Sequence, residues 1–128
     1  MFKPYNKSNR YHNRKIKLDG ITFDSMAEAD YYALLLWKQK AGIIKNLQLQ
    51  VPFELIPAYT DHNNKKVRAV KYVADFVFER DNKMIIVDVK GTQTKEFIIK
   101  WKLLGYKYPE YVREIVTRKS PNQEWQVL

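Results

Sequence analysis

Two apolar segments joined by a two-residue turn constrain the fold of this chain more than any other feature. Residues 67–80 and 83–90 have the composition of β-strands, and Asp81-Asn82 between them is a dipeptide typical of tight hairpin turns. One face of this hairpin is expected to be apolar and to pack on the core, which fixes the pairing register because a one-residue slip would exchange the faces. The residues expected on that face are Ala74, Phe76, Phe78, Ile85, Val87 and Val89.

The same register brings two carboxylates together on the other face. With Arg80 facing Lys83 across the turn, Asp75 lies directly opposite Asp88. Their Cβ atoms are expected about 4.5–5.5 Å apart. Lys90, two residues beyond Asp88, shares their face because side chains alternate along a strand.

Opposed carboxylates repel each other, and a divalent cation would offset that repulsion. The chain contains 0 cysteines and 2 histidines, which excludes thiolate zinc sites and iron–sulfur clusters and leaves oxygen ligands, so we expect Mg²⁺ or Mn²⁺. A neighbouring lysine can orient a water for attack on a phosphodiester. The alternative is that Asp75, Asp88 and Lys90 are ordinary surface charges, since D-x-K alone is a weak signal. The opposed pair and the following Gly91 favour a site.

The rest of the chain predicts a mixed α/β domain. The expected elements are a hairpin at 15–23 around Asp19-Gly20, a largely buried helix from Asp24-Ser25 to about Ala41, an extended segment at 43–55 broken by Pro52, a polar loop at 57–66, a helix at 94–107 ended by Pro109, a strand at 113–117 and a final edge near Trp125 and Val127.

The net charge of +9 is unevenly distributed. We expect a basic N-terminal arm at residues 1–17, which contains no acid, followed by a single domain at 18–128. A polyanion is the expected partner, and DNA fits better than a membrane surface because the arm lacks an amphipathic stripe. The alternative for the arm is a solvated terminus, and for the second helix an ordinary solvated face. The candidate phosphate-binding residues are Lys3, Lys7, Arg10, Arg14, Lys15, Lys95 and Lys102.

No apolar run approaches the roughly 18 residues needed to span a bilayer, and no apolar segment follows the charged N-terminus. We therefore expect a soluble cytoplasmic protein with no membrane partner.

Ala74-Asp75, followed thirteen residues after the aspartate by Asp88-Val89-Lys90, resembles the motif of the PD-(D/E)XK nuclease superfamily, with alanine in place of proline. This resemblance implies a restriction-endonuclease-like α-β-β-β-α-β core, a mixed sheet flanked by helices. It also implies that Asp75 and Asp88 bind the metal, that the Val89 carbonyl assists, and that Lys90 contacts the nucleophilic water.

Further strings, covering about residues 15–110, resemble a small phage-encoded endonuclease family related to Holliday-junction resolvases. They are Asp19-Gly20, Phe23-Asp24-Ser25 with Glu28, Asn46-Leu47-x-Leu49-Gln50, Tyr72-x-Ala74-Asp75-Phe76 and Val87-Asp88-Val89-Lys90-Gly91. This likeness implies a homodimer that cuts branched DNA in a bacterial host cell, because resolvases cut two strands symmetrically. The alternatives are a non-catalytic DNA-binding module on the same fold and a duplex-cutting nuclease of restriction or transposition type.

Glu28 has two interpretations. Ser25-x-x-Glu28 matches a capping box, in which the glutamate side chain returns to the N-cap amide, and the residues alone favour this role. The superfamily resemblance instead implies that Glu28 is a catalytic residue that reaches the metal, directly or through water. Gln50 matches a polar active-site position of some relatives only loosely.

Overall fold

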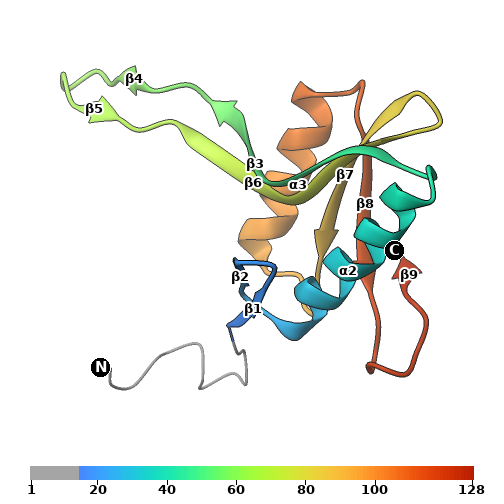
Figure 1. Cartoon of the computed structure of the whole chain (residues 1–128). Coiled ribbons are helices and arrows are strands. Elements are labelled where there is room, and N and C mark those ends of the chain that lie inside the picture. The colour runs from blue at the N-terminus through green and yellow to red at the C-terminus, as the bar shows by residue number, and fades with distance from the viewer. Residues whose placement is uncertain (1–14) are drawn as a thin grey trace, which may run out of the picture.

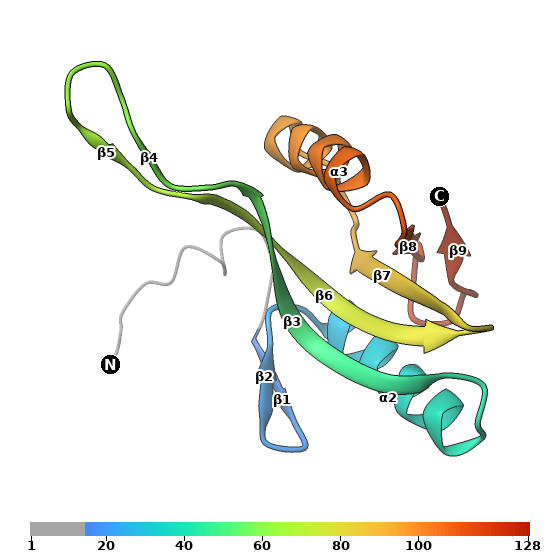
Figure 2. The same cartoon turned by 90° about the horizontal axis from the view of Figure 1, so that it is seen from above.

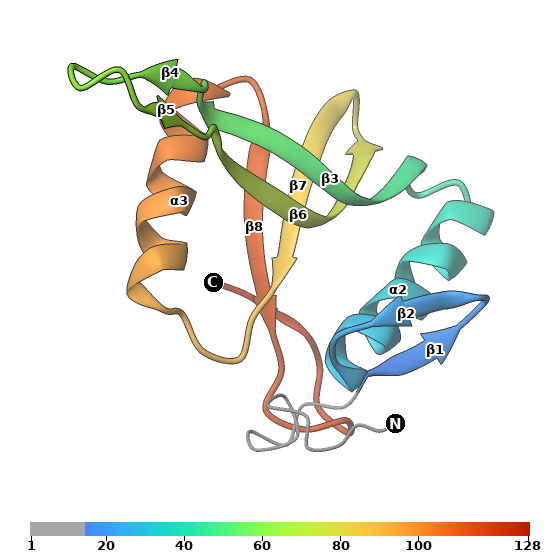
Figure 3. The ribbon, with the colours of Figure 1, turned by 90° about the vertical axis from the view of Figure 1, so that its left-hand side faces the viewer.

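Two helices cover opposite faces of a five-stranded mixed sheet (Figures 1 and 3). The computed structural model describes residues 15–128, so the predictions on Lys3, Lys7, Arg10 and Arg14 lie outside the described residues. The elements are β1 (Ile16–Leu18), β2 (Ile21–Phe23), α2 (Met26–Lys40), β3 (Lys45–Ile56), β4 (Tyr59–Thr60), β5 (Lys66–Val67), β6 (Val70–Arg80), β7 (Lys83–Val89), α3 (Lys95–Lys107), β8 (Val112–Thr117) and β9 (Gln126–Val127). The sheet order is β3-β6-β7-β8-β9, and the helix-strand-strand-strand-helix-strand order of the core confirms the predicted α/β class.

The β6–β7 hairpin forms in the predicted register. Arg80 pairs with Lys83, and the ladder continues to Phe76 opposite Val87. Asp81 and Asn82 both have positive φ, 53° and 63°, as a type I′ turn requires. The β1–β2 hairpin is also confirmed, with positive φ at the turn residues between its strands.

Both helices begin at the predicted residues. Ser25 caps α2, its Oγ accepting the Glu28 amide at 3.1 Å, and Thr94 caps α3 in the same way. Gly42, with φ of 78°, follows the end of α2. The prediction that α2 is largely buried is wrong, since Trp37 is 62% exposed. The sheet covers only one face of this helix.

The predicted apolar face of the hairpin is wrong at one residue. Phe76 and Phe78 pack toward α2, whereas Ala74 belongs to the cluster under α3. The alternation reverses at Asp75. There the β3–β6 ladder lacks the pair between Asp75 and Gln50, and Gln50 has a φ of 53°. Because helices cover both faces of the sheet, each strand can change faces and keep its side chains buried.

Pro52 does not interrupt the extended segment, contrary to prediction. Residue 52 lies inside β3 and pairs with Val73 of β6. The sheet tolerates a proline there because β3 is an edge strand and not every amide of an edge strand is needed for pairing.

The polar segment at 57–66 is not the irregular loop that its composition predicts. Tyr59 and Thr60 pair with Val67 and Lys66, so β4 and β5 form a two-stranded extension of the β3–β6 hairpin. This extension projects from the sheet beyond both helices (Figure 2).

The C-terminal third completes the sheet as predicted. β8 runs parallel to β7 because α3 carries the chain back across the sheet, and β9 pairs antiparallel with the end of β8. Trp125 packs edge-on against Tyr31 of α2, with ring centroids 4.9 Å apart. In the described part of the chain, no helix is long and apolar enough to cross a membrane.

Candidate active site

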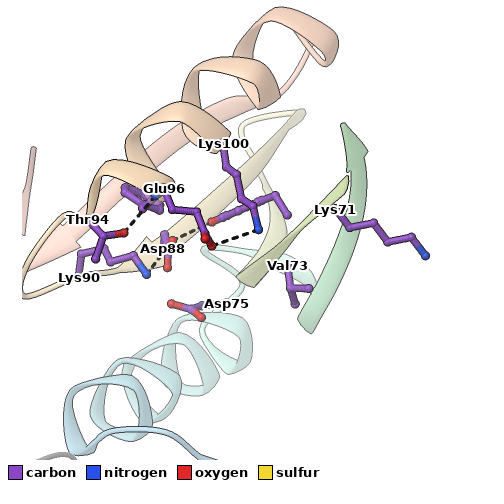
Figure 4. A pocket seen from close by; sticks show the side chains of 10 residues that line it. Lys71, Val73, Asp75, Asp88, Lys90, Thr94, Glu96 and Lys100 are labelled. Atoms are coloured by element: carbon purple, nitrogen blue, oxygen red, sulfur yellow. Dashed lines mark hydrogen bonds and ion pairs between the residues drawn. The ribbon is translucent and has the colours of Figure 1, made fainter. Parts of the chain in front are cut away.

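Asp75, Asp88 and Lys90 meet where β6 and β7 lie beside the start of α3. Together they line a cavity of about 300 Å³, shown in Figure 4. The register of the hairpin places the two carboxylates, and the step from β7 to α3 places Lys90 and Thr94 beside them. Asp75, Asp88 and Lys90, which were predicted to share one side of the hairpin, therefore line one cavity. Lys71 and Lys100 also line the cavity.

Asp88 is the buried acid of the site. Its side chain is almost fully enclosed, with the residue 2% exposed. A buried charge is costly unless it is paired. The Tyr72 hydroxyl donates to Oδ2 of Asp88 at 2.9 Å, and Nζ of Lys90 lies 3.5 Å from the same oxygen. Asp88 is thereby held in one orientation.

Asp75 is half-buried beside Asp88. Its Oδ2 accepts a hydrogen bond from the Val89 amide at 2.8 Å. Burial raises the pKa of Asp75 well above its usual range, and the hydrogen bond and negative charge of Asp88, then the charge of Glu28, raise it further. The carboxylate pair therefore favours binding a proton or a cation over carrying two unbalanced charges.

Lys90 is fixed on two sides. Its Nζ lies 4.7 Å from the centre of the Phe97 ring as well as close to Asp88. A cation over an aromatic face is attracted to the ring. The amine is thus held at the cavity wall next to the carboxylates, with its side chain still partly exposed.

Glu28 approaches from the opposite side, at the first turn of α2. It lines a second cavity of about 650 Å³ with Val89, Gly91 and Thr94, and Thr94 belongs to both cavities. Burial raises the pKa of Glu28 to about 7, and the negative charges of Asp24 and Asp88 add to the rise. Glu28 is therefore close enough to sense the charge on Asp88.

Only half of the predicted capping box is present. The Ser25 hydroxyl accepts the Glu28 amide, but within residues 15–128 no hydrogen bond joins the Glu28 carboxylate to the Ser25 amide. The cap of α2 is made by the serine, and the backbone donor that acts on the glutamate carboxyl is the amide of Asp24, which lowers the pKa of Glu28 in part.

The donor set fits a hard divalent cation. Among residues 15–128, no three Asp, Glu, His or Cys side chains gather closely enough to hold an ion by themselves. Two adjacent, dehydrated carboxylates are nevertheless what Mg²⁺ commonly takes, with water and phosphate completing its shell. Asp75 and Asp88 would hold the ion. A contribution from the Val89 carbonyl, and one from Glu28 through water, stay predictions.

The remaining predicted residues lie around this centre. Lys95 and Lys102 are exposed on α3, and neither pairs with an acid of the described chain, whereas Lys100 pairs with Glu96 at 3.4 Å. Lys15 is exposed just before β1. Gln50 is exposed and lines neither cavity, and the β3–β6 ladder lacks a pair between Gln50 and Asp75.

Tyr72 is the site residue that sequence reasoning missed. The chain has 9 tyrosines, and composition does not distinguish one of them. The available signal was its position on the strand of Asp75, three residues earlier. The reversal of faces at Asp75 brings Tyr72 to the side of Asp88, and the sequence does not show that reversal.

Comparison with known families finds a match to the chain. The family described as "Protein of unknown function (DUF1064)" matches residues 8–123. The chain belongs to this family. The match covers α2, α3, the two-stranded extension of β4 and β5, and every residue of the DUF1064 candidate site described above. A search of curated proteins finds no match to the chain.

Proposed function

We propose that this DUF1064 protein is a divalent-metal-dependent endodeoxyribonuclease. The observation that carries the proposal is the convergence of Asp75, Asp88 and Lys90 on one cavity, with the two acids adjacent and the amine 3.5 Å from Asp88. Paired carboxylates and a lysine are the groups that metal-assisted hydrolysis of a phosphodiester needs. The net charge of +9 supports a polyanionic substrate.

Each side chain has a role in this proposal. A bound Mg²⁺ or Mn²⁺ would offset the charge of the scissile phosphate and lower the pKa of a water. Lys90 orients the attacking water and stabilises the charge that develops on the phosphate. Tyr72 holds Asp88 in place, and Lys71 and Lys100 at the cavity wall attract the DNA backbone.

The finer identity rests on the motifs. We assign the chain to the PD-(D/E)XK superfamily, as a phage-type relative of Holliday-junction resolvases that acts as a homodimer on branched DNA in the cytoplasm of a bacterial host. The spacing of Asp75 from Asp88-Val89-Lys90 and the α-β-β-β-α-β order support the superfamily. The preference for branched DNA is supported by the phage-family strings alone.

Cleavage assays test the proposal directly. Wild type, Asp88→Asn and Asp81→Asn are incubated with four-way junction, duplex and single-stranded DNA in Mg²⁺, Mn²⁺ or EDTA. We expect metal-dependent cutting by wild type and by Asp81→Asn, a matched change at an exposed turn, and a loss of at least about 100-fold in Asp88→Asn.

The outcomes separate the alternatives. Binding without cutting of any substrate would contradict the enzyme and favour a DNA-binding module. Duplex cutting as fast as junction cutting would contradict only the resolvase-like specificity and favour a restriction- or transposition-type nuclease.

A further inference from the structure

The β4–β5 ribbon (residues 57–69) has no role in the core. No residue between 56 and 71 is buried, and the ribbon projects away from the sheet in both views of Figures 1 and 2. Ordering an exposed segment costs conformational entropy without the return of apolar burial. A structured extension of this kind therefore needs local hydrogen bonds to keep its shape. Binding of a partner would account for its presence.

The tip of the ribbon is built by local hydrogen bonds. Oδ1 of Asp61 accepts from the amides of Asn63 at 2.8 Å and Lys65 at 3.0 Å, and the Asp61 amide donates to the Lys65 carbonyl at 2.9 Å. Asn64 takes the positive φ of 62° that the turn requires. The one acid of the ribbon is thus engaged in shaping the turn.

The rest of the ribbon's charge is positive. Lys65, Lys66 and Arg68 are exposed, and none of them pairs with an acid in the part of the chain that the structure describes. Asn63 and Asn64 at the tip add amide groups that can donate and accept. Basic side chains with amides at a projecting tip are complementary to phosphates and base edges.

This surface is continuous with the candidate active site. β6 carries Lys71 on the wall of the cavity and Asp75 in it, and the same strand leads back to the ribbon. Figure 4 shows Lys71 pointing outward, away from the carboxylates. From Asp75 to Lys65 the extended chain spans about 33 Å at about 3.3 Å per residue. That length is close to one turn of B-DNA, about 34 Å.

We infer that the β4–β5 ribbon grips duplex DNA about one helical turn from the bond that is cut. A two-stranded ribbon fits the major groove, which is about 12 Å wide. This inference rests on the proposed function. In it the ribbon binds the duplex, and Asp75, Asp88 and Lys90 carry out the hydrolysis. The ribbon lengthens the contact of a small domain with its substrate.

Binding of duplex DNA in EDTA tests the inference. The ribbon variant, Lys65→Ala with Lys66→Ala and Arg68→Ala, is compared with a far-end variant, Lys40→Ala with Lys45→Ala and Lys83→Ala. The far-end lysines are also exposed and lie at the other end of the sheet, so both variants lose three charges. We expect the ribbon variant to bind about 10-fold more weakly or worse, with a log–log salt slope lower by about 2–3, and the far-end variant to bind within about 2-fold of wild type. Equal losses in both variants would overturn the inference.

Two further results decide between related ideas. Light scattering is expected to give the same mass for all three proteins; a dimer that becomes a monomer only in the ribbon variant would overturn the inference in favour of a protein contact. Because binding is measured without metal, the two proposals fail separately. If the ribbon variant binds DNA more weakly but the wild-type protein cuts no DNA, the ribbon inference would be supported and the nuclease proposal contradicted. If the wild-type protein cuts DNA but the ribbon variant binds DNA as tightly as wild type, the ribbon inference would be contradicted and the nuclease proposal would stand.

Discussion

At the scale of single residues, the candidate site contains an electrostatic conflict between two neighbouring carboxylates. Asp75 and Asp88 are brought together by the strand register, and burial denies them the water that would screen their charges. Tyr72 and Lys90 balance Asp88, while among residues 15–128 Asp75 receives only the Val89 amide. The conflict is relieved by a proton or by a cation, so the fold is expected to be more stable without the second charge.

Asp75→Asn is therefore expected to stabilise the metal-free protein. The pKa of Asp75 is raised in the folded state, so its ionisation opposes folding increasingly as the pH rises above the unfolded value near 4. We expect the variant to gain about 1–3 kcal/mol in free energy of unfolding at pH 8 in EDTA and much less at pH 4.5. Urea unfolding at both pH values measures this. With Mg²⁺ present, wild type gains stability and the variant does not. A variant less stable than wild type at pH 8 would show that Asp75 is ionised and well paired.

Tyr72→Phe tests the hydrogen bond to Asp88. Loss of the hydroxyl leaves a buried carboxylate with Lys90 as its remaining partner in the described part of the chain, so Asp88 is held less firmly in one orientation. Metal-dependent cutting should then fall, and stability should fall by about 1–3 kcal/mol. Tyr106→Phe, which removes the same atom from a residue that is 89% exposed, is the control. Unchanged cutting with lower stability would reduce Tyr72 to a packing residue.

At the scale of elements, the start of α2 combines a cap and a candidate site residue. Ser25→Ala should lower the free energy of unfolding by about 1 kcal/mol, because the Glu28 amide loses its acceptor, and should leave metal-dependent cutting nearly unchanged. Glu28→Gln should behave in the opposite way. The raised pKa of about 7 means that ionised Glu28 does not favour folding above that pH, so we expect stability to be kept and cutting to be reduced.

Denaturation and cleavage measured side by side at pH 8 distinguish the two roles. Glu124→Gln, a change of the same kind at an exposed residue, is the control. Unchanged cutting and lower stability in Glu28→Gln would return this residue to the capping box.

The elements also show what the sequence could and could not predict. The β6–β7 hairpin follows from Asp81-Asn82 and from the apolar run on each side, which are local signals. It was enough to bring Asp75 and Asp88 to one cavity, although the ladder itself ends at Phe76 opposite Val87. The reversal of faces at Asp75 depends on Gln50 in another strand, so local alternation could not predict it. The β4–β5 ribbon has too few apolar residues for its strands to be predicted from composition. Its strands form as a continuation of the β3–β6 pairing. The role of Tyr72 was missed because its contact with Asp88 depends on the reversal of faces at Asp75.

At the scale of the whole molecule, the charge is arranged around a neutral body. Residues 18–90, which contain both aspartates of the site, have no net charge, whereas the segments on either side carry the excess. Within that body the ribbon is locally basic, and its cations lie apart from the acids of the β6–β7 turn. The substrate is thus expected to be attracted by the periphery and cut at the centre, which separates affinity from chemistry.

The basic N-terminal arm allows this separation to be measured. Ala substitution of Lys3, Lys7, Arg10 and Arg14 removes four positive charges, so the log–log dependence of DNA affinity on salt should become less steep by up to about 3–4. Because the described lining of the cavity of Asp75 and Asp88 comes from residues 71–100, we expect cutting at saturating DNA to change little while the half-saturating DNA concentration rises. Fluorescence anisotropy across a salt series, with single-turnover cutting, measures both. The control replaces Lys38, Lys40, Lys45 and Lys83, which removes the same charge from the neutral body. An arm variant whose affinity and salt slope match wild type would show that these four residues belong to a solvated terminus, and the attraction of DNA would then rest on α3 and the ribbon.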